Sequence, residues 1–321
     1  MLVKEMRDIL KKYDKEQIID IAVELYKKVP KDKKEDYDID NYIISNSSKL
    51  KKKEDELSFD ELINDINRFL TCVDNDLYAY PNKIINKSER SKWRFKVKKY
   101  YKILTSLTPD TDDGMIATKF LPEIFKRLST GSVYLKFSSW NTFGAIGVSQ
   151  SEYYGMLVRR ILYNGVDIDN IRKCVNLLTV EKSSDELSSS MFYTLLNSLN
   201  YKNINLDTIN IIEELINNLK ERKNKVKSNM LIYKIETDIN DCVELICNMY
   251  FRMNDFDKGI KYFKKNYIHY NKEVKEYILL ELIEEYEEIE IWIKEYESNK
   301  LDYRDSLKEK YNKYKSILNS K

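Results

Sequence analysis

Residues 129–150 read STGSVYLKFSSWNTFGAIGVSQ, and they hold three of the seven glycines in a chain of 321 residues. Six of the seven glycines lie between Gly114 and Gly165, and only Gly259 lies elsewhere. Glycine and proline are the residues that most often interrupt regular structure, so the glycine-poor segments on either side can run as helices. This distribution predicts a helical protein with one irregular insert, residues 129–150.

Local sequence patterns also locate several helix starts. Capping boxes, in which a helix-capping side chain and a Glu or Gln three residues later bind each other's backbone N–H groups, are predicted at Asp14, Ser58 and Ser149. Pro122 lies inside an apolar pattern that runs to Leu128, which predicts a kink or a break there. From residue 168 onward, apolar periodicity predicts helices over residues 168–179, 184–198, 205–225, 228–253, 255–267, 271–297 and 302–318.

The expected fold class is therefore all-α, an irregular α-solenoid of stacked antiparallel helix pairs with one glycine-rich irregular insert. Residues 46–57 carry almost no apolar side chains and predict a linker that follows a small N-terminal helical unit, residues 1–45. Residues 58–165 are expected to form a helical domain that contains the insert. Residues 166–321 are expected to form a C-terminal array of helical pairs.

Composition restricts the class of protein. Hydrophobic residues make up 42% of the chain, enough for a core, and the net charge of +2 argues neither for nor against nucleic acid. The four cysteines form no CxxC pair, and no apolar run is long enough to cross a membrane or to act as a signal peptide. We expect a soluble, cytoplasmic protein with reduced thiols and no membrane partner. The frequent Lys, Asn, Ile and Tyr are typical of an AT-rich genome.

A basic run with interleaved aromatic residues spans residues 87–102. On the expected helix, Trp93 and Val97 belong to an apolar stripe that faces the core, whereas Phe95 does not. The cations could neutralise phosphates or an acidic partner while an aromatic ring stacks on a base. The simpler interpretation, a solvated helix face, is preferred. The candidate binding residues are Lys92, Arg94, Phe95, Lys96 and Lys99.

The insert is the second candidate site, through Trp140, Asn141 and Phe143. Irregular segments inside a helical scaffold often carry function. The alternative is a packed connection in which Trp140 and Phe143 fill the core, and both interpretations stay open. An acidic run, Glu281 to Glu290, is expected to be a solvated face, with docking against the basic helix as the alternative.

Motifs for chemistry are missing from the sequence. His269 is the only histidine, and no carboxylate or thiol stands at ligand spacing from it, so we expect no metal site. Ser149 lacks the second glycine of a nucleophile elbow, and the glycines of the insert lack the Gly-Lys-Ser/Thr of a phosphate-binding loop. No catalytic residue and no cofactor are predicted.

One short segment resembles a known family. Val243, Ile246, Cys247 and Tyr250 follow a large, large, small, aromatic series, and Asn254, Phe256, Gly259 and Phe263 occupy the turn and second-helix positions that follow. By this series of residues, segment 243–263 resembles a tetratricopeptide unit. No second copy stands 34 residues away on either side. The resemblance implies a helical hairpin closely packed at Gly259 and, more weakly, peptide binding.

These observations favour a non-enzymatic helical scaffold that binds a protein or peptide partner. The alternative is a nucleic-acid-associated protein that uses the basic helix 87–102. A third hypothesis, an enzyme, requires a deep pocket lined by several carboxylates.

Overall fold

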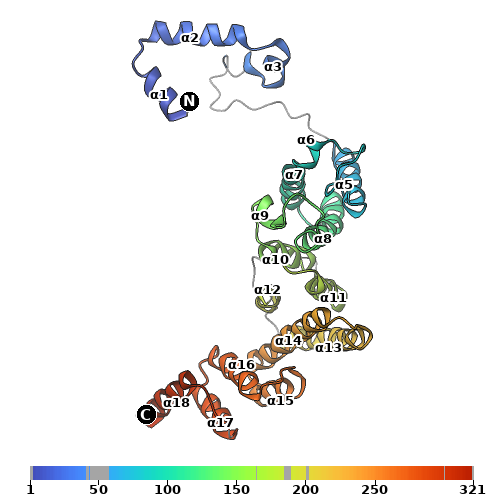
Figure 1. Cartoon of the computed structure of the whole chain (residues 1–321), viewed down its shortest axis with the longest axis vertical. Helices are drawn as coiled ribbons and strands as arrows, with labels where there is room; N and C mark the ends of the chain where they lie inside the picture. Colours follow the sequence, from blue (N-terminus) through green and yellow to red (C-terminus); the bar gives the residue numbers. More distant parts are fainter. Residues whose placement is uncertain are drawn as a thin grey trace. The chain divides into compact units, whose positions relative to one another are not determined.

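The structure is a computed structural model that describes residues 3–40, 43, 58–163, 165–183, 189–199, 202–299 and 301–319. Regular structure within these residues is helical and includes no strand (Figure 1). The all-α fold class is therefore confirmed. The predicted linker, residues 46–57, lies outside the described residues, and the predicted domain boundaries stay predictions.

Contacts along the chain divide it into two units, Met1–Glu61 and Leu62–Lys321. The first contains α1 (Val3–Leu10), α2 (Lys15–Lys28) and α3 (Lys31–Asp36). The capping box predicted at Asp14 starts α2: its side chain accepts from the backbone N–H of Gln17 at 2.8 Å, and its own N–H donates to Gln17 Oε1 at 3.0 Å. No side chain described between residues 5 and 40 is buried.

The second unit begins within α5, which the predicted capping box of Ser58 and Glu61 starts. Its helices are α5 (Phe59–Asp74), α6 (Lys87–Arg90), α7 (Trp93–Ser106), α8 (Asp112–Gly131), α9 (Thr142–Ile146), α10 (Gln150–Ile161), α11 (Ile168–Asn176), the short 3₁₀ helix η1 (Leu177–Thr179), α12 (Ser190–Ser198), α13 (Lys202–Lys225), α14 (Asn229–Arg252), α15 (Phe256–Asn266), α16 (Lys272–Glu284), α17 (Ile289–Ser298) and α18 (Asp305–Asn319).

Helix α8 continues through Pro122, so the break that was one of the two predicted outcomes does not occur, and the kink stays a prediction. Proline removes one hydrogen bond from the helix interior. Leu121 and Ile124 on either side of it are fully buried, and their packing holds the helix together. The insert is also shorter than expected: α8 extends to Gly131, and the third predicted capping box, Ser149 with Glu152, starts α10 at residue 150.

Helices of the C-terminal half pack on their neighbours in sequence and on the next helix but one. The consecutive pairs include α13 with α14, α14 with α15, and α17 with α18; the skipped pairs include α12 with α14 and α14 with α16. The single helix predicted over 271–297 is wrong. It is two helices, α16 and α17, because the chain turns at residues 285–288, where Glu287 adopts a left-handed φ of 58°.

Helices α14 and α15 form the segment that resembles a tetratricopeptide unit. Asn254 between them has a φ of 59°, which fits a position where glycine is common. Gly259 is buried, and a Cβ atom added there would lie 2.6 Å from the Phe251 ring and 3.2 Å from the Cys247 carbonyl oxygen. The close helix packing expected at Gly259 is present, while membership of that family stays a prediction.

None of the helices in the described part of the chain combines the length and apolar character that a membrane span requires. All four cysteines are buried and form no disulfide. Burial raises the pKa of the Cys174, Cys242 and Cys247 thiols, which keeps them protonated and unreactive at neutral pH.

Candidate functional site

The basic run lies on α6 and α7. Trp93 and Val97 are buried, as the apolar stripe predicts, and Phe95 is 59% exposed. The Arg94 guanidinium carbon lies 5.0 Å from the centre of the Phe95 ring, within cation–π range. Lys92, at the N-cap of α7, is exposed. The structure therefore leaves an aromatic ring and an arginine together in solvent.

Lys96 and Lys99 differ from the other predicted binding residues. Lys96 Nζ donates to Asp65 Oδ1 at 2.7 Å, and the Tyr100 hydroxyl donates to Asp65 Oδ2 at 2.6 Å. Lys96 is therefore part of a structural cluster between α5 and α7 and is not a free cation. Lys99 is partly buried.

Two exposed lysines of the same run, Lys98 and Lys102, were not among the predicted binding residues. Lys98 is four residues after Arg94 and Lys102 is four residues after Lys98, so these side chains share one side of α7. The spacing alone could have identified them. We call Arg94, Phe95, Lys98 and Lys102 the basic face.

The insert places its three candidate residues differently. Trp140 is 53% exposed, Phe143 is buried, and Asn141 caps α9, since its Oδ1 accepts from the Gly144 N–H at 2.6 Å. Phe137 is the second ring of the insert that fills the core, and it stacks on Trp93 with centroids 4.3 Å apart. The packed-connection hypothesis expected both rings to be buried, and this holds for Phe143 but not for Trp140. The sequence could not distinguish the two rings, because an irregular backbone has no period from which burial can be predicted.

The structure brings the insert and the basic helix together. Helix α9 packs on α7, and Trp93 Nε1 donates to Ser138 Oγ at 3.3 Å. A Cβ atom added at Gly147 would lie 3.4 Å from Lys98 Nζ, so the end of the insert adjoins the basic face. The basic face and Trp140 therefore belong to neighbouring segments. We call the exposed residues Arg94, Phe95, Lys98, Lys102 and Trp140 together the α7–insert surface. A cavity of about 270 Å³ lies beside α9, and Asn141 and Phe143 help to line it.

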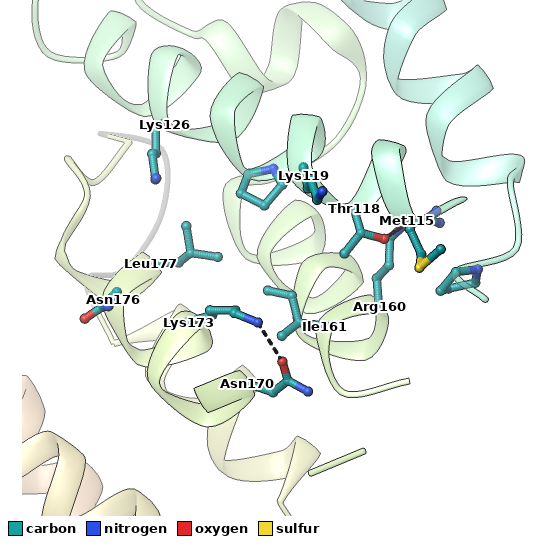
Figure 2. Close-up of a pocket in the computed structure, with 12 residues that line it drawn as sticks. Met115, Thr118, Lys119, Lys126, Arg160, Ile161, Asn170, Lys173, Asn176 and Leu177 are labelled. Atoms are coloured by element: carbon teal, nitrogen blue, oxygen red, sulfur yellow. Dashed lines mark hydrogen bonds between the residues drawn. The ribbon is translucent and has the colours of Figure 1, made fainter. Parts of the chain in front are cut away.

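A larger pocket, of about 610 Å³, lies between α8, α10 and α11 (Figure 2). It was not predicted from the sequence. Its cationic lining residues are Lys119, Lys126, Arg160 and Lys173; its apolar ones are Pro109, Met115, Pro122, Ile161 and Leu177; and its neutral polar ones are Thr118, Asn170 and Asn176. Lysines scattered along two separate helices give no local signal that they meet around one cavity.

Arg160 anchors the wall of this pocket. It is 7% exposed and donates to the carbonyl oxygens of Leu107 at 2.7 Å and Gly114 at 2.8 Å, and to Thr118 Oγ1 at 2.7 Å. Burial lowers the pKa of its guanidinium. These hydrogen-bond partners, two backbone carbonyl oxygens and one hydroxyl, are all neutral.

The feature that an enzyme hypothesis requires is a roomy pocket lined by carboxylates. Asp241 and Glu244 line a cavity next to α12, but its volume is only about 10 Å³, close to the least that a single water needs. Burial, then the charge of Asp241, raises the pKa of Glu244 to about 7. In the described residues no group of three or more His, Cys, Asp or Glu is placed to hold a metal ion.

A second pair of carboxyl groups is buried between α15, α16 and α17. Glu276 and Glu295 are 5% and 7% exposed. Burial, then the hydrogen bond with Glu295, raises the pKa of Glu276 to about 8. Burial opposes ionisation of Glu295, but hydrogen bonds from Glu276 and Lys264 outweigh it and hold its pKa below the ordinary value. The pair therefore shares one proton at neutral pH.

The acidic run from Glu281 to Glu290 is not one solvated face, because it crosses the turn between α16 and α17. Glu281 Oε1 lies 3.0 Å from Lys310 Nζ, and Glu284 pairs with the same lysine. These two carboxylates therefore hold α18 against α16 and have partners other than the basic helix.

Comparison with known proteins gives no information about the function. No protein-family model, curated protein or solved structure matches the chain.

Proposed function

We propose that the protein is a non-enzymatic helical scaffold that binds a protein or peptide partner through the α7–insert surface. The observation that carries this proposal is the exposure of Phe95 and Trp140 on neighbouring segments, beside the cations of the basic face. Tryptophan, tyrosine and arginine are the residues that contribute most to protein interfaces. A partner with acidic side chains around an apolar anchor would complement this surface.

The helical architecture supports the same function. In the C-terminal half, helices pack on their sequence neighbours and on the next helix but one, which is the pattern expected of stacked helix pairs in an α-solenoid. Such arrays commonly bind extended partners. The four unpaired cysteines fit a reducing compartment, and we propose the cytoplasm as the place of action.

The test is a native pull-down with quantification of each co-purified protein. Phe95→Ala and Trp140→Ala should each weaken capture of a specific partner by about 10- to 30-fold, as expected for the loss of an interface hot spot. Tyr270→Ala removes an aromatic ring that is 96% exposed outside the surface and is the matched control. A partner that all three variants retain equally would contradict the proposal.

The nucleic-acid alternative predicts a different result. An exposed ring under an arginine could also stack on an unpaired base. Binding to a labelled single-stranded oligonucleotide would then weaken steeply with salt and be lost in the triple variant Lys92→Glu, Lys98→Glu, Lys102→Glu. We expect no such binding, and its appearance would replace the protein partner with a nucleic acid.

A further inference from the structure

The pocket between α8, α10 and α11 is separate from the α7–insert surface and has the size of a ligand site. Its volume of about 610 Å³ lies within the roughly 300–1,000 Å³ typical of small-molecule pockets. Three segments contribute to it, so its shape depends on the folded arrangement and not on one local turn. Figure 2 shows Lys126 extending from α8 and Lys173 placed on α11 opposite.

The charge of the lining has one sign. Four cations line the pocket, and none of its lining residues is acidic. Lys126 is neutralised in part by Glu123, whose Oε1 lies 2.7 Å away. Lys173 donates to a neutral partner, Asn170 Oδ1, at 3.0 Å, and Lys119 has no ion pair among the described residues. Like charges that face one cavity repel each other, and an anion between them would remove that repulsion.

Arg160 is an independent observation that points to the same ligand charge. A buried charge is costly unless an opposite charge compensates it. Its three hydrogen bonds are to neutral acceptors, so they satisfy its donors and leave its charge uncompensated. An anion in the adjoining pocket would supply that charge.

The rest of the lining is apolar. Met115, Ile161 and Leu177 face the same space, and they suit a ligand with an apolar body better than an inorganic ion. We propose that this pocket binds a small organic anion, with its anionic group among Lys119, Lys126 and Lys173 and its apolar body against Met115 and Ile161.

Phenyl phosphate is the probe, with phenol and inorganic phosphate as its two halves. In the full chain labelled at the methionine methyl groups with ¹³C, the Met115 signal reports directly on the pocket, and Met115→Leu assigns it. Met230, which is 81% exposed on α14, does not line the pocket and is the internal reference. We expect phenyl phosphate to shift the Met115 signal saturably, inorganic phosphate to bind more weakly, and phenol to bind least.

The double variant Lys119→Gln, Lys173→Gln should weaken phenyl phosphate by about 10-fold or more, since a hydrogen bond to a charged group is worth roughly that factor. Both lysines are exposed, so the unchanged signals of the other methionines will show that the fold is kept. Lys261→Gln, at an exposed lysine on α15, should leave the affinity unchanged. Phenol binding as tightly as phenyl phosphate, equal affinity in the double variant, or no Met115 shift at millimolar probe would each overturn the proposal.

Discussion

Gly259 is the residue at which one missing side chain decides how two helices meet. A Cβ atom there would clash with the Phe251 ring, which cannot move freely because it stacks on Phe256 at 4.7 Å. Gly259→Leu should therefore overpack the contact between α14 and α15 and cost about 1–3 kcal/mol of unfolding free energy. Urea denaturation measures this, with Lys261→Ala on the exposed side of α15 as the control. An unchanged midpoint would mean that the contact is loose.

The carboxyl pair of Glu276 and Glu295 predicts how stability depends on pH. The pKa of Glu276 is raised from 4.5 to about 8 in the folded chain. Its contribution to stability is therefore complete below about pH 4.5 and is lost as the pH rises through about 8. Glu276→Gln keeps a neutral donor to Glu295 but cannot ionise. The variant should lose less stability than the wild type between pH 5 and pH 8, by about 1 kcal/mol or more.

Thermal unfolding across that range tests the pH prediction. Glu244 also has a raised pKa, of about 7, and stays in both proteins, so part of the slope should remain in the variant. Glu290→Gln, at an exposed carboxyl, is the matched control. Parallel curves for wild type and Glu276→Gln would show that Glu276 is already ionised in the folded state.

At the scale of the element, α7 carries one lysine that forms an ion pair with a neighbouring helix, Lys96, and one that lies on the surface two residues later, Lys98. Lys96→Glu would place a second carboxylate beside Asp65, next to the buried Tyr100, whereas Lys98 is exposed. We expect Lys96→Glu to cost about 1–2 kcal/mol and Lys98→Glu to stay within about 0.5 kcal/mol. Chemical denaturation of the two variants side by side decides this. Equal effects would show that the ion pair with Asp65 contributes nothing.

Sequence patterns predicted where helices start better than where they stop. The capping boxes at Asp14, Ser58 and Ser149 are local, and all three are present. Pro122 does not break α8, because the tertiary packing of its buried neighbours outweighs one lost hydrogen bond. The prediction of one helix over residues 271–297 missed the turn at Glu287, because a glutamate gives no sign in the sequence of a left-handed backbone conformation.

The candidate sites show the same limit. The cations of α7 follow a helical period, so their exposed face could be inferred once the buried stripe was known. Trp140 and Phe137 lie in irregular backbone, where no periodic pattern shows which of the two rings is buried in the core. The pocket around Lys119 and Lys173 depends on contacts between helices distant in sequence, which no local pattern encodes.

The whole molecule consists of two contact units, and the sequence places the predicted linker, residues 46–57, next to their boundary at Glu61. Its lysines make it a substrate for trypsin. Limited digestion should cut there first and release a C-terminal fragment that starts within or just after the linker. Mass spectrometry of the earliest fragments identifies the site. A first cut inside the second unit would count against the boundary.

The two units should also differ in stability. No side chain described between residues 5 and 40 is buried, whereas the second unit buries rings such as Trp93, Phe125 and Trp292. Since isolated helices of this length are marginal in water and helical stability comes mostly from packing, the first unit should add little. We expect a truncated chain, residues 58–321, to melt within about 2 °C of the full chain, a shift that corresponds to less than about 1 kcal/mol. A peptide of residues 1–45 should show weak helicity by circular dichroism. A large loss of melting temperature on truncation would mean that the first unit packs on the second in solution.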